Sequence, residues 1–322
     1  MSVPETLNKI KEWAAGNKQM RAVVLIGSQA RTQNQADKWS DIDVILFTSH
    51  PQKYQNEDQW LQEIGNLLSC YNGLEVADST FVKRVYFEDG VGMDVTPVQV
   101  RAIDWAYRYA WLKSKLPAGL PSTSFTTKME KPIRNFAYYI RRGMSVLVDK
   151  GNYRDKLNFI ESNFKYLAPS APTLEKLEEQ INQFWQTALR MAIKLSRKEF
   201  FTAKIECEAP LKLNLLTMLE WHAKCVNGWQ FETWHKGRYI ERWADPKIVE
   251  GLKFVYGRYD ERDSWNSLLK TMELFEKVSH EVEGHLRYNY DKLPEQRFRE
   301  WIEELHRQAQ VGAPGRASDR YM

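Results

Sequence analysis

The stretch GSQARTQNQADKWSDIDVILF, residues 27–47, places Asp41 and Asp43 one residue apart where an apolar run begins. Successive side chains of a strand point to opposite faces, so both aspartates should point one way while Ile42 and Val44 enter a core. Neighbouring carboxylates repel each other unless a cation lies between them. Mg²⁺ is suited to this arrangement, because it prefers a few carboxylates together with substrate phosphate oxygens. A lone Asp-x-Asp is also common at turns and strand edges, so further residues are needed to support a site.

Two further features lie in adjoining predicted strands. A short apolar strand over residues 21–27 ends in a Gly-Ser turn, where Gly27 permits close approach of a ligand and Ser28 offers a hydroxyl to phosphate. Asp94, in VGMDVTPV, stands in the middle of a second predicted strand and shares a face with Gly92 and Thr96. A carboxylate in the middle of a strand needs a polar partner or a function.

The periodicity of apolar residues divides the chain into two parts. In the first part, the pattern predicts a helix after Ser2, strands over 21–27 and 41–47, a helix over 60–68, and a hairpin of strands over 79–87 and 91–98. A helix over 101–115 and a Pro/Gly-rich break at 117–121 follow. Helical period then continues over 133–151, 174–204, 209–229, 263–286 and 294–309.

We therefore predict an α+β fold with two domains. Residues 1–130 should form a domain with a mixed β-sheet and helices, and residues 131–311 should form an all-α helical bundle. The tail 312–322, which is small, polar and contains Gly and Pro, should be poorly ordered.

Composition narrows the class of protein. No apolar run approaches the roughly 20 residues that cross a bilayer, and no signal-peptide block is present, so we expect a cytoplasmic protein. Three scattered cysteines support neither disulfides nor a structural zinc site. Residues 1–100 carry 9 Lys/Arg and 13 Asp/Glu, whereas the remainder carries 37 and 29. This split suits an acidic catalytic half and a phosphate-binding basic half better than a nucleic-acid binder, although solvated surfaces of unequal sign explain it equally well.

The order strand, Gly-Ser, Asp-hydrophobic-Asp, strand and later Asp resembles the nucleotidyltransferase superfamily related to DNA polymerase β. The segment GSQAR belongs to this resemblance, which implies that Gly27, Ser28 and Arg31 contact ATP. Farther along, NQFWQTALRMAIKLSRKEFFTA, LLTMLEWH and GRYIERW are similar to the aminoglycoside 6-adenylyltransferase, or streptomycin adenylyltransferase, family. The implied activity is transfer of AMP from ATP to an aminoglycoside hydroxyl, with the 6-hydroxyl of streptomycin as the first candidate and antibiotic resistance as the result.

The resemblance also assigns roles to the three aspartates. Asp41 and Asp43 would hold Mg²⁺, two ions in all, and Asp94 would act as a third ligand, as the general base, or as both. Expected partners are ATP and a cationic aminoglycoside, without nucleic acid or membrane, in a monomer or homodimer. The alternatives are a nucleotidyltransferase acting on a lincosamide, a protein hydroxyl or an RNA end, and a catalytically silent nucleotide-binding module.

Two groups in the helical half are candidate binding residues. Lys194, Arg197 and Lys198 fall within one turn and could reach phosphates, although a solvated basic face is the alternative. Glu220 could bind an ammonium or guanidinium group of the acceptor, with Trp185 or Trp221 stacking on the acceptor. A structural, salt-bridged Glu220 is the alternative.

The segment HEVEGH superficially resembles a zinc-protease motif. His280 and His285 are five residues apart, however, which on a helix turns the second ring about 140° from the first. This pair therefore predicts no zinc site.

Overall fold

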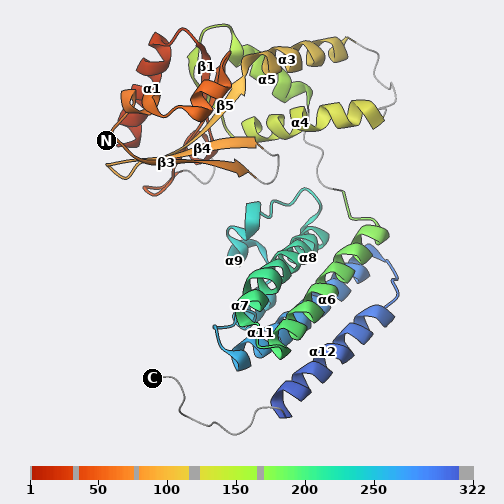
Figure 1. Cartoon of the computed structure of the whole chain (residues 1–322). Coiled ribbons are helices and arrows are strands. Elements are labelled where there is room, and N and C mark those ends of the chain that lie inside the picture. The colour runs from red at the N-terminus through yellow and green to blue at the C-terminus, as the bar shows by residue number, and fades with distance from the viewer. Residues whose placement is uncertain (1, 32–35, 76–79, 116–123, 165–169, 312–322) are drawn as a thin grey trace, which may run out of the picture. The chain divides into compact units, whose positions relative to one another are not determined.

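The computed structural model describes residues 2–31, 36–75, 80–115, 124–164 and 170–311 (Figure 1). The predicted break at 117–121 and the predicted tail at 312–322 lie outside these residues. The chain divides into two compact units, Met1–Tyr166 and Leu167–Met322. This division falls later than the boundary at 130 that we predicted, because a strand and a helix after residue 140 belong to the first unit.

The first unit is built on a six-stranded sheet with strand order β3-β4-β5-β2-β1-β6. β2 and β5 are parallel and the other neighbours are antiparallel, so the sheet is mixed, as predicted. The strands are β1 (Met20–Ile26), β2 (Ile42–Thr48), β3 (Leu67–Glu75), β4 (Thr80–Phe87), β5 (Gly92–Gln99) and β6 (Ser145–Asp149).

A separate apolar core covers each face of this sheet. Val23 and Val44 pack in the core that includes α1, whereas Val24 and Ile45 pack in the core that includes α3, α4 and α5. Adjacent residues thus serve opposite faces, as the two-residue period of a strand requires. The helices are α1 (Val3–Gly16), α2 (Pro51–Asn56), α3 (Val100–Ser114), α4 (Ser124–Arg141) and α5 (Tyr153–Asn163), with 3₁₀ turns η1 (Gly27–Ala30) and η2 (Gln59–Glu63).

The predicted helix over residues 60–68 is wrong. The 3₁₀ turn η2 occupies Gln59–Glu63, and β3 begins at Leu67, where it pairs with Phe87 of β4. Trp60, Leu61 and Ile64 are buried in the core beside α1. Their spacing therefore reflected burial of a short turn rather than a continuing helix.

The predicted helix over residues 133–151 is correct only in its first half. α4 ends at Arg141, and Gly143 has a φ of 140°, a backbone conformation that favours glycine. β6 then follows and pairs antiparallel with β1, at the edge of the sheet. This pairing is why the first unit extends past residue 130.

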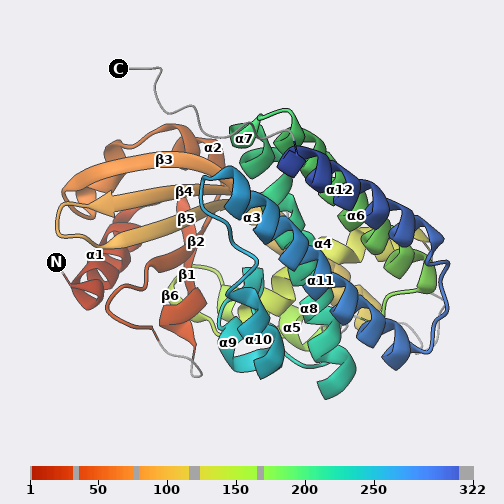
Figure 2. The same ribbon diagram turned by 90° about the horizontal axis from the view of Figure 1, so that it is seen from below.

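Among the residues that the structure describes, the second unit contains helices and helical turns but no strand, which confirms the predicted C-terminal helical bundle, although it starts later than residue 131. α6, α8, α11 and α12 are its long helices and lie side by side (Figure 2). The elements are α6 (Leu174–Ser196), α7 (Phe200–Thr202), the π-helical turn η3 (Ala203–Glu208), α8 (Ala209–Asn227), the 3₁₀ turn η4 (His235–Gly237), α9 (Ile240–Trp243), α10 (Pro246–Leu252), α11 (Glu261–Leu286) and α12 (Leu293–Val311).

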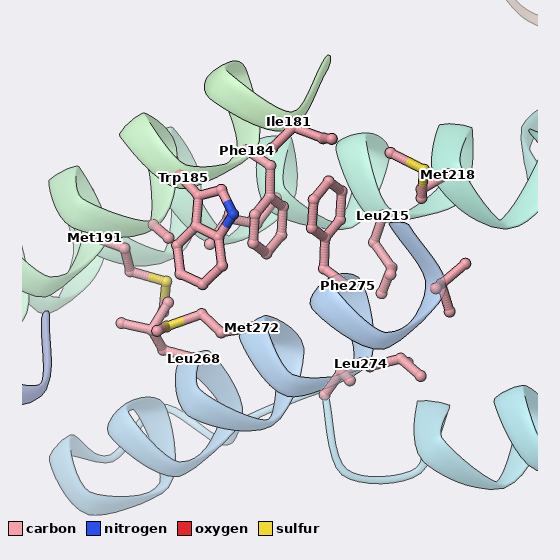
Figure 3. Packing of buried hydrophobic residues seen from close by; sticks show 14 of the residues in the cluster. Ile181, Phe184, Trp185, Met191, Leu215, Met218, Leu268, Met272, Leu274 and Phe275 are labelled. Carbon is pink, nitrogen blue, oxygen red and sulfur yellow. The ribbon is translucent and has the colours of Figure 1, made fainter. Parts of the chain in front are cut away.

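The core of the second unit is aromatic and sulfur-rich at its centre. Phe184 of α6 stacks on Phe275 of α11 with 3.6 Å between ring centroids, and Trp185 lies on the Phe184 side of the pair with Met191 and Met272 next to it (Figure 3). In the part of the chain that the structure describes, no helix is long and apolar enough to cross a membrane.

Candidate active site

The three predicted aspartates come together in the first unit. Asp43 of β2 and Asp94 of β5 are direct partners in the parallel ladder, and Asp41 immediately precedes β2. One carboxylate oxygen from each of the three lies within 4.8 Å of the others. Asp41 is exposed and the other two are half-buried, so the cluster is open to a ligand.

Buried neighbours hold these carboxylates in place. Ile42 and Met93 are paired across β2 and β5, and both are almost fully buried. A slip of one residue would bring the aspartates into the core and expose the apolar side chains. The alternating burial of the two strands therefore determines that Asp43 and Asp94 share one face.

Gly27 positions the Gly-Ser turn against this cluster. Its φ is 71°, and a Cβ there would lie 2.8 Å from Cγ of Asp43 and closer still to the carboxylate oxygen Oδ2. Ile26, the residue before it, pairs with Asp43 across β1 and β2. Glycine is thus required both for the backbone conformation and for space beside the carboxylate of Asp43.

Arg84 is a site residue that the sequence analysis missed. It lies opposite Asp94 in the antiparallel β4–β5 pair, with 3.4 Å between its Nε and Oδ2 of Asp94. Its Nη1 also donates to the hydroxyl of Tyr71 on β3. The alternation of STFVKRVYF and the short EDG hairpin could have predicted this cross-strand pair.

Two further glycines bring backbone close to the site: Gly92, which the sequence analysis placed on the same face as Asp94, and Gly143, which it missed. A Cβ on Gly92 would lie 3.1 Å from the Tyr86 ring and 3.6 Å from Cβ of Asp41. A Cβ on Gly143 would lie 2.5 Å from the carbonyl oxygen of Ala30, in the Gly-Ser turn. The segment before β6 therefore packs directly on that turn, which no local pattern in the sequence indicates.

Comparison with known proteins places the chain in a family. Residues 2–305 match the sequence model of streptomycin adenylyltransferase. The chain belongs to the streptomycin adenylyltransferase family. Family membership makes it a nucleotidyltransferase, as the resemblance of its aspartate motif implied.

Similar proteins of this family cover nearly the whole chain. The aminoglycoside 6-adenylyltransferase of Bacillus subtilis (strain 168) is 22% identical over 304 residues, covering 91% of this chain and 94% of the relative. That of Campylobacter jejuni is 24% identical over 294 residues, covering 90% and 91%. A crystal structure of an aminoglycoside 6-adenyltransferase from Bacillus subtilis aligns with a TM-score of 0.42 and 21% identity, covering 94% of this chain and 98% of that one.

Two of the three basic residues predicted to bind phosphate form ion pairs within the second unit. Lys194 forms an ion pair with Glu199 at 2.6 Å, and Lys198 pairs with Glu261. Arg197 is exposed at the C-terminal end of α6. Phosphate binding by these residues stays a prediction, and two of the three charges are already compensated by carboxylates.

The predicted acceptor residues differ in accessibility. Trp185 is 1% exposed and packs against Phe184 in the core, so it has no open ring face on which an acceptor could stack. This burial contradicts its predicted role. Trp221 and Glu220 on α8 are half-buried. Burial raises the pKa of Glu220, while Lys224 acts in the opposite direction, and acceptor binding by Glu220 and Trp221 stays a prediction.

Proposed function

We propose that this chain transfers AMP from ATP to a hydroxyl of an aminoglycoside, with the 6-hydroxyl of streptomycin as the first candidate, and thereby confers resistance. The observation that carries the proposal is the convergence of Asp41, Asp43 and Asp94 in a chain whose family is that of streptomycin adenylyltransferases. The named relatives are only 22–24% identical to this chain. The identity of the acceptor and of its modified hydroxyl is therefore part of what we propose.

The aspartate cluster fits divalent metal ions. Three carboxylates within 4.8 Å of one another offer the oxygen ligands that Mg²⁺ prefers, and the absence of a side chain at Gly27 keeps the space beside Asp43 open. Asp41 and Asp43 would hold two Mg²⁺ ions, with Asp94 as a shared ligand. When bound, Mg²⁺ neutralises charge on the triphosphate and on the pyrophosphate that leaves.

The residues of this site then have separate roles. Gly27 and Ser28 contact the phosphates of ATP, and Arg31 follows them at the end of the turn. The acceptor oxygen bonds to the α-phosphorus as the bond from that phosphorus to the pyrophosphate oxygen breaks. Asp94 accepts the proton of the acceptor hydroxyl as general base, and Arg84 orients its carboxylate from the neighbouring strand.

Mass spectrometry tests this proposal directly. The protein is incubated with ATP, Mg²⁺ and streptomycin, and we expect pyrophosphate and a drug that has gained one AMP. Asp43→Asn should abolish transfer because it removes metal-binding charge, whereas Glu57→Gln, at an exposed carboxylate after α2, should leave it unchanged. Absence of AMP transfer to every aminoglycoside would refute the acceptor class. Transfer to a lincosamide, a protein or RNA would identify the alternative acceptor, and no turnover with intact ATP binding would indicate a silent nucleotide-binding module.

A further inference from the structure

A second group of potential metal ligands lies in the helical unit. Glu276 and His280 are four residues apart on α11, and Glu295 is in the first turn of α12. One ligand atom from each lies within 4.8 Å of the others. Residues four apart share one face of a helix, and the short segment from 287 to 292 returns the chain so that Glu295 meets that face.

Each carboxylate in this group is oriented by an outer partner. The hydroxyl of Tyr290 donates to Oε2 of Glu295 at 2.7 Å. Nη2 of Arg299 donates to Oε2 of Glu276 at 2.5 Å. Each contact uses Oε2 of its carboxylate, and in Glu295 the other oxygen, Oε1, lies 3.2 Å from Nε2 of His280. Metal-binding carboxylates and histidines are commonly supported by outer hydrogen bonds of this kind.

The imidazole of His280 supplies an independent observation. Its Nε2 is shielded from solvent and has no hydrogen-bond partner among the described residues, although it lies 3.2 Å from Oε1 of Glu295. Glu295 itself is 4% exposed. A buried polar atom without a hydrogen bond is costly, and native structures contain few of them. The imidazole as a whole is half-exposed, and the distance from its Nε2 to Oε1 of Glu295 is one that a single cation bound to both atoms would allow.

We propose that Glu276, His280 and Glu295 bind one divalent transition-metal ion of the zinc class, which ties α12 to α11. One imidazole nitrogen with two carboxylate oxygens suits Zn²⁺ and other divalent first-row ions such as Co²⁺ and Mn²⁺. Mg²⁺ prefers oxygen ligands alone, so the aspartate cluster and this group differ in the ion they select. The site uses His280 without His285, so it is not the zinc-protease arrangement that HEVEGH resembles.

Calorimetric titration of metal-free protein with Zn²⁺ tests the proposal. The chain carries Asp41→Asn and Asp43→Asn so that the first cluster does not compete. We expect one Zn²⁺ per chain, and His280→Gln in this background should weaken binding by about 100-fold or more. His285→Gln is the matched control, because it removes an imidazole from the same helix outside the group, and it should leave affinity unchanged. Co²⁺ in place of Zn²⁺ should give a visible absorption band that His280→Gln abolishes.

The thermal midpoint supplies a second readout. Zn²⁺ should raise the Tm of the chain with intact His280 and not that of the variant, because an ion that binds only the folded state stabilises it. Should His280→Gln fail to fold by circular dichroism, Glu276→Gln removes a ligand from the more exposed side and takes its place. The proposal is overturned if the double Asn chain binds no Zn²⁺, or if either ligand variant binds it with unchanged affinity. In that case the group is an ion pair between His280 and Glu295.

Discussion

Gly27 carries two requirements at a single residue, a positive φ and space for the carboxylate of Asp43. We predict that Gly27→Ala lowers kcat/KM by at least about 100-fold, because the new methyl group would displace the carboxylate of Asp43, which we propose binds metal, by a large fraction of an ångström. The measurement is the rate of AMP transfer with Mg²⁺ and the aminoglycoside in excess.

Gly90→Ala is the matched control for this change. Gly90 has a φ of 84°, but a Cβ there would meet nothing within 4 Å. Both variants therefore share the backbone strain, and only Gly27→Ala collides with the site. Equal losses in the two variants would show that strain alone, rather than contact with Asp43, limits activity.

Arg84 is expected to position Asp94 from the neighbouring strand. Arg84→Gln should lower kcat about 10-fold, as is usual for a group that orients a catalytic residue. The same change should tighten apparent Mg²⁺ binding, because it removes a positive charge beside the carboxylates. Steady-state rates at several Mg²⁺ concentrations separate the two effects, and Arg84→Lys should recover part of kcat. A lower kcat without tighter Mg²⁺ binding would indicate a purely structural role.

At the scale of elements, α8 carries a half-buried lysine, Lys212, that contacts α11. The ammonium of Lys212 donates to Oγ1 of Thr271 at 2.7 Å, and burial lowers its pKa from 10.5 to about 8. Below pH 8 both the folded and unfolded chains hold the proton, and the folded chain carries the full cost of the buried charge. Between pH 8 and 10.5 only the unfolded chain stays protonated, so the contribution of this group to stability rises with pH.

Lys212→Met should therefore raise the free energy of unfolding at pH 7 by up to about 3 kcal/mol. The difference from the unmodified chain should shrink as pH rises from 8 toward 10.5. Urea unfolding at a series of pH values measures this difference in the free energy of unfolding. Lys253→Met, at an exposed site, is the control. A difference that stays constant through this window would contradict the linkage.

The strands differ in how well their positions could be predicted from the sequence. In β5 buried and half-buried residues alternate around Asp94, and in β2 Asp43 is half-buried between the buried Ile42 and Val44, so the faces of both aspartates could be predicted from residue order. β6 offers only the short apolar run SVLVD, which suits a helix as well as a strand. Its pairing with β1 is a contact between residues more than 100 positions apart, and no local pattern contains that information.

For the whole molecule, the two units have separate apolar cores. We expect residues 1–164 and residues 170–311, produced as separate chains, each to give a folded circular dichroism spectrum. Neither should transfer AMP, because holding two substrates in line supplies much of the acceleration. The first chain should still bind ATP with Mg²⁺, since the aspartate cluster lies within it. Transfer by residues 1–164 alone would show that the helical unit is dispensable.

The sequence by itself placed the protein among the nucleotidyltransferases, through the resemblance of its Gly-Ser and aspartate motif to that superfamily. The spacing of Gly27, Asp41, Asp43 and Asp94 predicted one polar face, since strand alternation and a glycine turn are local properties. The packing of Trp185 in the core and the meeting of Glu295 with His280 required the folded chain. These are contacts between separate elements, and they depend on register and helix packing, which are set by how all the apolar faces are buried together.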